Sequence, residues 1–102
     1  IVIEFHFMDS IIEKKVFDFM ESAFEKLLSL FTVVHIHPNN NDKYISYQGE
    51  KFPRTIEMTF HRTDRIKSKW YANTFPHPLD IKNNPIASDL NLPPNWYSIS
   101  GN

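Results

Sequence analysis

Residues 1–37 read IVIEFHFMDSIIEKKVFDFMESAFEKLLSLFTVVHIH, a strand pattern, a helix pattern and a second strand pattern in direct succession. Residues 1–8 alternate apolar and polar side chains, as a half-buried strand does. Apolar residues then recur at steps of three and four, which predicts an amphipathic helix over residues 10–30. Residues 31–37 alternate again and end at Pro38, which cannot continue a sheet ladder. This succession predicts a β-α-β unit with two parallel strands.

The predicted helix supplies the main apolar surface for packing on the sheet. It opens with Ser10-Ile11-Ile12-Glu13, which fits a capping box, in which the Ser and Glu side chains bond free backbone donors. We expect its apolar face to pack as core and to have no role in cofactor binding. That face consists of Ile12, Val16, Phe19, Met20, Ala23, Phe24, Leu27, Leu30 and Phe31.

The second half of the chain predicts one more main strand and then an irregular tail. Residues 44–47 favour a short strand, Gly49 a turn, and residues 54–62 a third main strand that runs antiparallel. Five of the seven prolines lie in residues 76–94, so residues 73–102 are expected to form an irregular Pro/Asn-rich tail of the same domain as residues 1–72. Apolar residues expected to pin this tail are Trp70, Tyr71, Phe75, Leu79, Leu90, Leu92 and Trp96.

Composition excludes several classes of function. The 102 residues suffice for one small domain. A net charge of −1 provides no bulk positive field, so we expect neither nucleic acid nor a membrane as partner. Cysteine is absent, which excludes disulfides and thiolate metal sites and is compatible with the cytoplasm, although the sequence does not indicate a location. Because the chain begins inside a strand pattern and without methionine, we expect it to be a piece of a longer protein.

The polar positions of the three predicted main strands hold most of the histidines. Alternation places Glu4 with His6 on one face, His35 with His37, and Glu57 with His61. If the strands are neighbours, these side chains converge on one sheet face. An imidazole there can act as a general base for an acceptor hydroxyl, and imidazoles with carboxylates also suit zinc or iron. Hydrogen-bonded polar packing is the alternative that needs no function.

Two further segments are candidate binding sites. Pro38-Asn39-Asn40-Asn41-Asp42 follows a strand at the end where open α/β sheets bind ligands, although Asn and Asp are also favoured in ordinary turns. The other candidate is a set of basic residues beside Trp70 and Tyr71, made up of Arg54, His61-Arg62 and the run Arg65-Ile66-Lys67-Ser68-Lys69-Trp70. Such a run can grip phosphate, but an exposed loop or helix explains it equally.

Several short motifs resemble the C-terminal part of FkbM-like methyltransferases. They are Glu4-Phe5-His6, the segment from Val34 to Asn40, the segment from Phe52 to Phe60, and the tail segment from Pro78 to Pro85. The resemblance covers most of the chain. It implies a class I methyltransferase fold, Rossmann-like, with S-adenosylmethionine as methyl donor. This chain then provides the fifth, sixth and seventh strands, and the antiparallel seventh lies between the fifth and the sixth.

The resemblance also implies roles for individual residues. His6, His35 and His37 are the expected catalytic residues, and Asn39, Asn40, Glu57 and His61 the expected contacts to a small-molecule or glycan-like acceptor. No cofactor-binding residue is assigned, because Gly49 and Gly101 are the only glycines and neither forms a glycine-rich loop after a strand. We expect the rest of the parent chain to bind S-adenosylmethionine, and this chain by itself not to methylate a substrate.

Two alternatives to the enzyme fragment stay open. The domain is a non-catalytic protein-binding module if its polar sheet face or its tail docks a partner. It is a small metal-binding domain if the histidines and glutamates gather around an ion, although we expect no metal.

Overall fold

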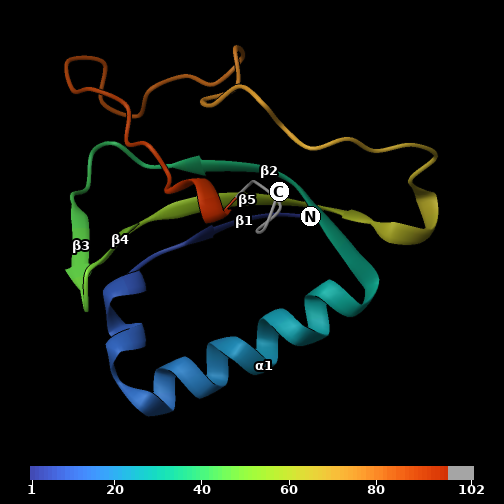
Figure 1. Ribbon diagram of the computed structural model, residues 1–102, viewed down its shortest axis with the longest axis horizontal. Coiled ribbons are helices and arrows are strands. Elements are labelled where there is room, and N and C mark those ends of the chain that lie inside the picture. The colour runs from blue at the N-terminus through green and yellow to red at the C-terminus, as the bar shows by residue number, and fades with distance from the viewer. Residues whose placement is uncertain (97–102) are drawn as a thin grey trace.

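The computed structural model describes residues 1–96 (Figure 1). This part of the chain is a small α/β domain with one α-helix and two antiparallel sheets. The elements in chain order are β1 (Val2–Phe5), the 3-10 helix η1 (Met8–Ile12), α1 (Lys14–Leu30), β2 (Phe31–Pro38), β3 (Tyr44–Tyr47), β4 (Glu50–Pro53), β5 (Ile56–Arg62), and the 3-10 helices η2 (Thr63–Arg65) and η3 (Pro94–Trp96).

The main sheet has the strand order β1-β5-β2. Both β1 and β2 pair antiparallel with β5, so they run parallel to each other on either side of it. The register aligns Glu4, Glu57 and His37 in one row across the three strands. A β-bulge between Val33 and His35 interrupts the β2–β5 ladder. The predicted β-α-β unit with an antiparallel third strand is therefore confirmed.

The sheet separates the helix from the tail. In Figure 1, α1 lies below the sheet and residues 66–90 run above it. Alternation along β5 explains this layering, because Ile56, Met58 and Phe60 are buried while Glu57 and Thr59 are only half-buried. The buried core consists of Met8, Ile56, Met58, Phe60 and Leu92, and Leu92 comes from the tail.

The predicted capping box is wrong, because α1 begins at Lys14 rather than at Ser10. Residues 8–12 form η1 instead, and Glu13 then adopts an extended backbone (φ −76°, ψ 126°) that interrupts the helix. The Ser10 hydroxyl donates to the carbonyl oxygen of Phe7 (2.6 Å) and bonds no free donor of α1. Tertiary contacts, rather than the capping pattern, determine the local structure of residues 8–12. Met8 is buried, and its N–H donates to the carbonyl oxygen of Arg54 (2.9 Å).

The apolar face of the helix that packs on the sheet is narrower than predicted. Phe19 and Leu30 are 72% and 65% exposed and Ile12 is 45% exposed, so none of the three belongs to the core. Phe24 stacks on Phe5 with ring centroids 5.2 Å apart, and this contact sets which side of α1 faces the sheet. At about 100° per residue, Phe19 lies about 140° around the helix from Phe24. The residues that face inward are Val16, Met20, Ala23, Phe24 and Leu27.

A β3–β4 hairpin packs beside the main sheet. Sequence patterns predicted β3 with its observed bounds but missed β4, because Glu50 and Lys51 show no apolar alternation. Gln48 and Gly49 both have positive φ (51° and 80°), the combination found in type I′ turns. This turn joins β3 and β4 with the right-handed twist that paired strands need.

Tyr44→Phe tests how β3 holds the tail. The Tyr44 hydroxyl donates to the carbonyl oxygen of Asn91, so the variant should be less stable by about 1 kcal/mol near neutral pH. Burial raises the pKa of Tyr44 above its usual 10.0, so the folded state keeps this proton longer than the unfolded chain does. Wild type should therefore lose stability relative to the variant as pH rises through about 10. Urea unfolding of both proteins at about pH 7 and pH 10.5 measures this, and a gap that widens at high pH contradicts it.

The tail is held partly as predicted. Leu92 is buried at 4% exposure, and Phe75 and Trp96 pack partly buried against the same core, as expected. Trp70, Tyr71 and Leu79 are 84%, 67% and 83% exposed and do not pin the tail. Polar contacts from β2, from the loop after it and from β3 also hold residues 77–91. Residues 97–102 of the predicted tail, including Gly101, lie outside the described residues.

Candidate functional site

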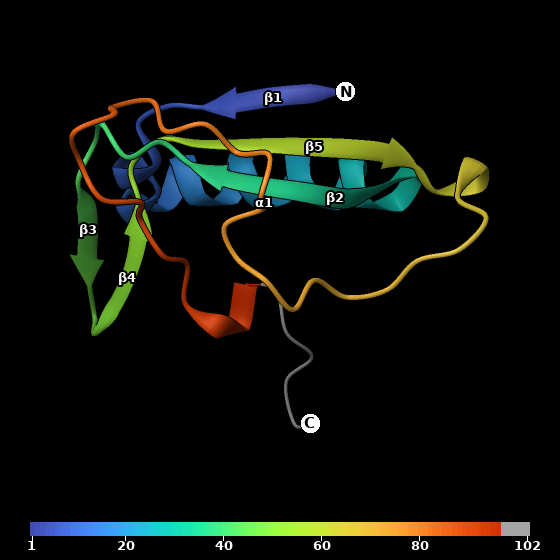
Figure 2. The ribbon, with the colours of Figure 1, turned by 90° about the horizontal axis from the view of Figure 1, so that it is seen from above.

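The carboxyl ends of β1 and β2 meet at one end of the main sheet. Figure 2 shows both arrows pointing to the end where the β3–β4 hairpin lies, while β5 points the other way. Side chains that follow the carboxyl ends of parallel strands are those best placed to contact a ligand in an open α/β sheet. The residues gathered there come from β1, η1, the loop after β2 and the start of β5.

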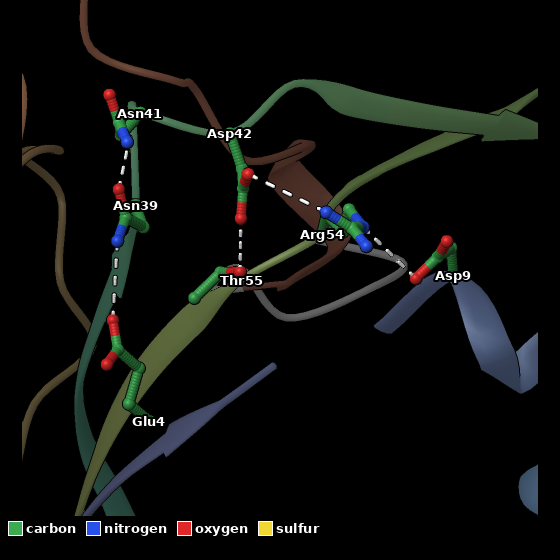
Figure 3. Close-up of polar contacts among 7 residues, drawn as sticks. All are labelled: Glu4, Asp9, Asn39, Asn41, Asp42, Arg54 and Thr55. Atoms are coloured by element: carbon green, nitrogen blue, oxygen red, sulfur yellow. Dashed lines mark hydrogen bonds and ion pairs between the residues drawn. The ribbon is translucent and has the colours of Figure 1, made fainter. Parts of the chain in front are cut away.

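A histidine, a carboxylate and an amide form a chain of polar contacts at this end. Asn39 Nδ2 donates to Glu4 Oε1 (3.3 Å), and Glu4 Oε2 lies 3.2 Å from His6 Nε2. The Asn39 side chain is itself fixed, because its Oδ1 accepts from the backbone N–H of Asn41 (2.9 Å, Figure 3). The side chains of His6 and Glu4 remain 56% and 40% exposed. A carboxylate that orients an accessible imidazole is an arrangement suited to general base chemistry.

A second group at the same end surrounds Arg54. Its guanidinium lies between the carboxylates of Asp9 (3.4 Å) and Asp42 (3.9 Å), as Figure 3 shows. Its Cζ also lies 5.0 Å from the centre of the Phe7 ring. Asp42 accepts a further hydrogen bond from the hydroxyl of buried Thr55 (2.5 Å). These contacts connect the loop after β2 to η1 and to the residues just before β5. They therefore fix the positions of the elements that form this end of the sheet.

The sequence placed Arg54 in a basic candidate site for phosphate, whereas its guanidinium pairs with two carboxylates, and it assigned neither Asp9 nor Phe7 to a site. Phe7 follows β1 and has a left-handed backbone (φ 58°, ψ 41°), which is uncommon for a bulky residue. Its ring is 61% exposed beside His6. The sequence signal for this charged group is an Arg directly before a strand together with acidic residues in two turns. Charge pairs of this kind are common on protein surfaces, so the signal is not specific.

The two β2 histidines belong to a separate cluster beneath the tail. His35 Nε2 lies 2.7 Å from Asp80 Oδ1, and the backbone N–H of His77 donates to the other oxygen of Asp80 (3.0 Å). The His35 ring centroid is 6.2 Å from that of His37 and 6.1 Å from that of His77. Residues 77–80 therefore cover this part of the sheet, and Asp80 is the partner that sequence alone did not reveal.

The predicted convergence of histidines and glutamates is partial. Glu57 sits between Glu4 and His37 in register, but His6 lies beyond the end of β1. His61 lies near the opposite end of β5, where its Nδ1–H is placed to donate to the carbonyl oxygen of Arg62 (3.0 Å). Within residues 1–96, no three His, Asp or Glu side chains are arranged to hold a metal ion.

The side chain of Asn40 has a structural role. It is 6% exposed, and its Nδ2 lies 2.9, 3.2 and 3.4 Å from the carbonyl oxygens of Asn84, Ala87 and Ser88. Its Oδ1 accepts from the backbone N–H of Asn84 (2.8 Å). The side chain predicted to contact an acceptor therefore fixes the tail.

The described residues do not fit S-adenosylmethionine. Gly49 is the glycine among them, and it lies in the β3–β4 turn rather than between a strand and a helix. The main sheet has no glycine-rich approach for a nucleotide in residues 1–96. Within the same residues, no helix combines the length and apolar character needed to cross a membrane.

Comparison with known proteins identifies no relative of this chain: no family model, no curated protein and no solved structure matches it.

Proposed function

We propose that this chain is the C-terminal part of an FkbM-like, S-adenosylmethionine-dependent O-methyltransferase and provides the acceptor side of its active site. The observation that supports the proposal best is the strand order β1-β5-β2, with antiparallel β5 between two parallel strands joined through α1. The fifth, seventh and sixth strands of the class I methyltransferase fold have this order. In that fold the free edge of β1 is the place where the sheet continues.

The proposed chemistry of this chain is removal of the acceptor proton. His6 is the general base, because its imidazole is exposed at the carboxyl end of β1 and Glu4 lies 3.2 Å from its Nε2. With that nitrogen facing the carboxylate, Nδ1 is the atom that takes the proton from an acceptor hydroxyl. Asn39 orients Glu4 through the hydrogen bond that its Nδ2 donates to Oε1. The acceptor is a small polar molecule or a glycan-like hydroxyl compound.

The other residues predicted for catalysis or substrate contact have weaker support. His35 is paired with Asp80 beneath the tail, and His37 and Glu57 lie in the interior rows of the sheet. Asn40 is fully used in hydrogen bonds to the tail, and His61 lies at the far end of β5. We therefore assign the acceptor site to His6, Glu4 and Asn39.

The methyl donor requires residues beyond this chain. Since residues 1–96 do not fit S-adenosylmethionine, the rest of the parent protein binds it in this proposal. Calorimetric titration of the complete parent protein with S-adenosylmethionine is the first measurement. Absence of binding contradicts the methyltransferase assignment, whereas binding by the parent and not by this chain supports it.

His6→Ala in the parent protein tests the base. Loss of a positioned base should lower kcat by about 10²–10⁴-fold while S-adenosylmethionine affinity is unchanged. Lys15→Ala, an exposed change on α1, is the control and should retain full turnover. Circular dichroism of both variants checks that the fold is intact. Full turnover by a folded His6→Ala protein contradicts the role of His6.

A further inference from the structure

The outer edge of β2 is open. β2 is the last strand of the main sheet, with β5 on one side and no described strand on the other. The backbone N–H of Asn39 donates to the carbonyl oxygen of Thr55 (2.9 Å), and bonding alternates along an antiparallel ladder. The N–H and carbonyl of Ile36 therefore point away from β5. Among the described residues, none bonds to either group.

A groove runs along this edge. It has a volume of about 970 Å³ and separates β2 from the segment of residues 65–77. Figure 2 shows this segment arching away from β2 and returning above the sheet. The walls of the groove are mostly apolar or aromatic. They include Val34 from β2, Leu28 from α1, and Trp70 and Phe75 from the arching segment.

The outer wall of the groove is positively charged. Arg65, Lys67 and Lys69 line it, and no ion pair to an acidic residue of the described chain involves any of the three. Trp70 and Tyr71 follow them directly and are 84% and 67% exposed. The chain as a whole has a net charge of −1, so this basic wall is a local feature.

We propose that the groove binds an extended acidic peptide segment of a partner protein, which adds as a strand to the outer edge of β2. Two independent features support this occupant. The N–H and carbonyl of Ile36 are complementary to the alternating peptide donors and acceptors of an extended partner strand. The three cations complement acidic side chains on the outer side of that partner strand, while apolar side chains enter the groove.

The geometry limits the length of the segment. β2 has eight residues, which at about 3.3 Å per residue span roughly 26 Å. The bulge at Val34 interrupts regular pairing, so the continuous ladder lies nearer Ile36. A segment of about six to eight residues is therefore sufficient.

The proposal is tested with a probe peptide of eight residues that alternates Glu with Val and Ile. Titration of the protein, followed by Trp fluorescence and by amide exchange in NMR spectra, should give saturable binding and slow the exchange of the Ile36 amide at least tenfold. Reversing the three cations (Arg65→Glu, Lys67→Glu and Lys69→Glu together) should weaken binding at least tenfold. The matched control reverses Lys15, Lys26 and Lys51, which are exposed elsewhere, and should bind normally.

Three results would overturn the proposal. The first is no saturable binding of the acidic peptide by the folded protein. The second is equal binding of a peptide in which Lys replaces Glu, or of one in which alternate residues are N-methylated and cannot donate to the edge. The third is binding of an oligothymidylate or of a fatty acid that depends on the same three cations, while the peptide leaves Ile36 unprotected.

Discussion

Phe60→Ala should lower the free energy of unfolding by about 3–5 kcal/mol, measured by urea denaturation followed by circular dichroism. Phe60 is 2% exposed and lies on the central strand, where its ring packs 6.4 Å from that of Phe24. Truncation removes apolar burial and leaves a cavity between α1 and β5. Small domains are stable by only about 5–15 kcal/mol in total, so the variant should be close to unfolding at room temperature.

Phe19→Ala is the matched control for this prediction. It makes the same chemical change on α1, at a position where the ring is 72% exposed. Its effect should stay within about 0.5–1 kcal/mol, since surface substitutions remove little burial. Equal losses for the two variants would contradict the observed exposure of Phe19 and would restore the wider helix face predicted from periodicity.

The sequence was most informative where one hydrophobic period determined both the type of secondary structure and which face of it is buried. Alternation along residues 54–62 predicted a strand with Ile56, Met58 and Phe60 on one side, and the structure buries all three. The connection through one helix also predicted parallel β1 and β2, because a crossover of that length brings the chain back in the same direction. These conclusions depend on local pattern and chain connectivity alone.

Elements that depend on distant contacts were not predictable in the same way. Phe24 packs against Phe5 while Phe19 is exposed, whereas the pattern of the helix allowed Phe19 as a core residue equally well. The partner of His35 is Asp80, 45 residues away in an irregular segment. In the candidate site, the pairing of Glu4 with His6 followed from alternation, but the contact from Asn39 required the loop to fold back over β1.

Asn40 shows the same limit at the position where the loop and the tail meet. Four neighbouring residues, Asn39 to Asp42, are all typical of turns, and composition alone gives no reason to single out one of them. The structure buries Asn40 and leaves Asn41 exposed. The difference comes from the tail, which places three carbonyl oxygens and one N–H around the Asn40 amide, 44 to 48 residues away in the chain.

Asn40→Ala should therefore destabilise the protein by about 2–4 kcal/mol and release the tail. Removing the amide leaves the N–H of Asn84 and the carbonyl oxygens of Asn84 and Ala87 without their partner, and each unsatisfied buried group costs about 1–3 kcal/mol. Detachment of the tail lets water bond these groups, which limits the total. Urea unfolding measures the loss, and amide exchange at Asn84 should become faster before the main sheet opens.

Asn83→Ala is the control, because Asn83 is exposed in the same segment. It should change the unfolding free energy by less than about 0.5 kcal/mol and leave exchange at Asn84 unaltered. The unfolding free energy and the exchange rates together distinguish local release of the tail from a general loss of stability. Release of the tail should accelerate exchange from Asn84 to Leu92 while the amides of β5 keep their protection, since Ile56 and Phe60 are buried under α1. If instead β5 and the tail lose protection together, Asn40 supports the whole sheet, and the tail is not a separately detachable unit.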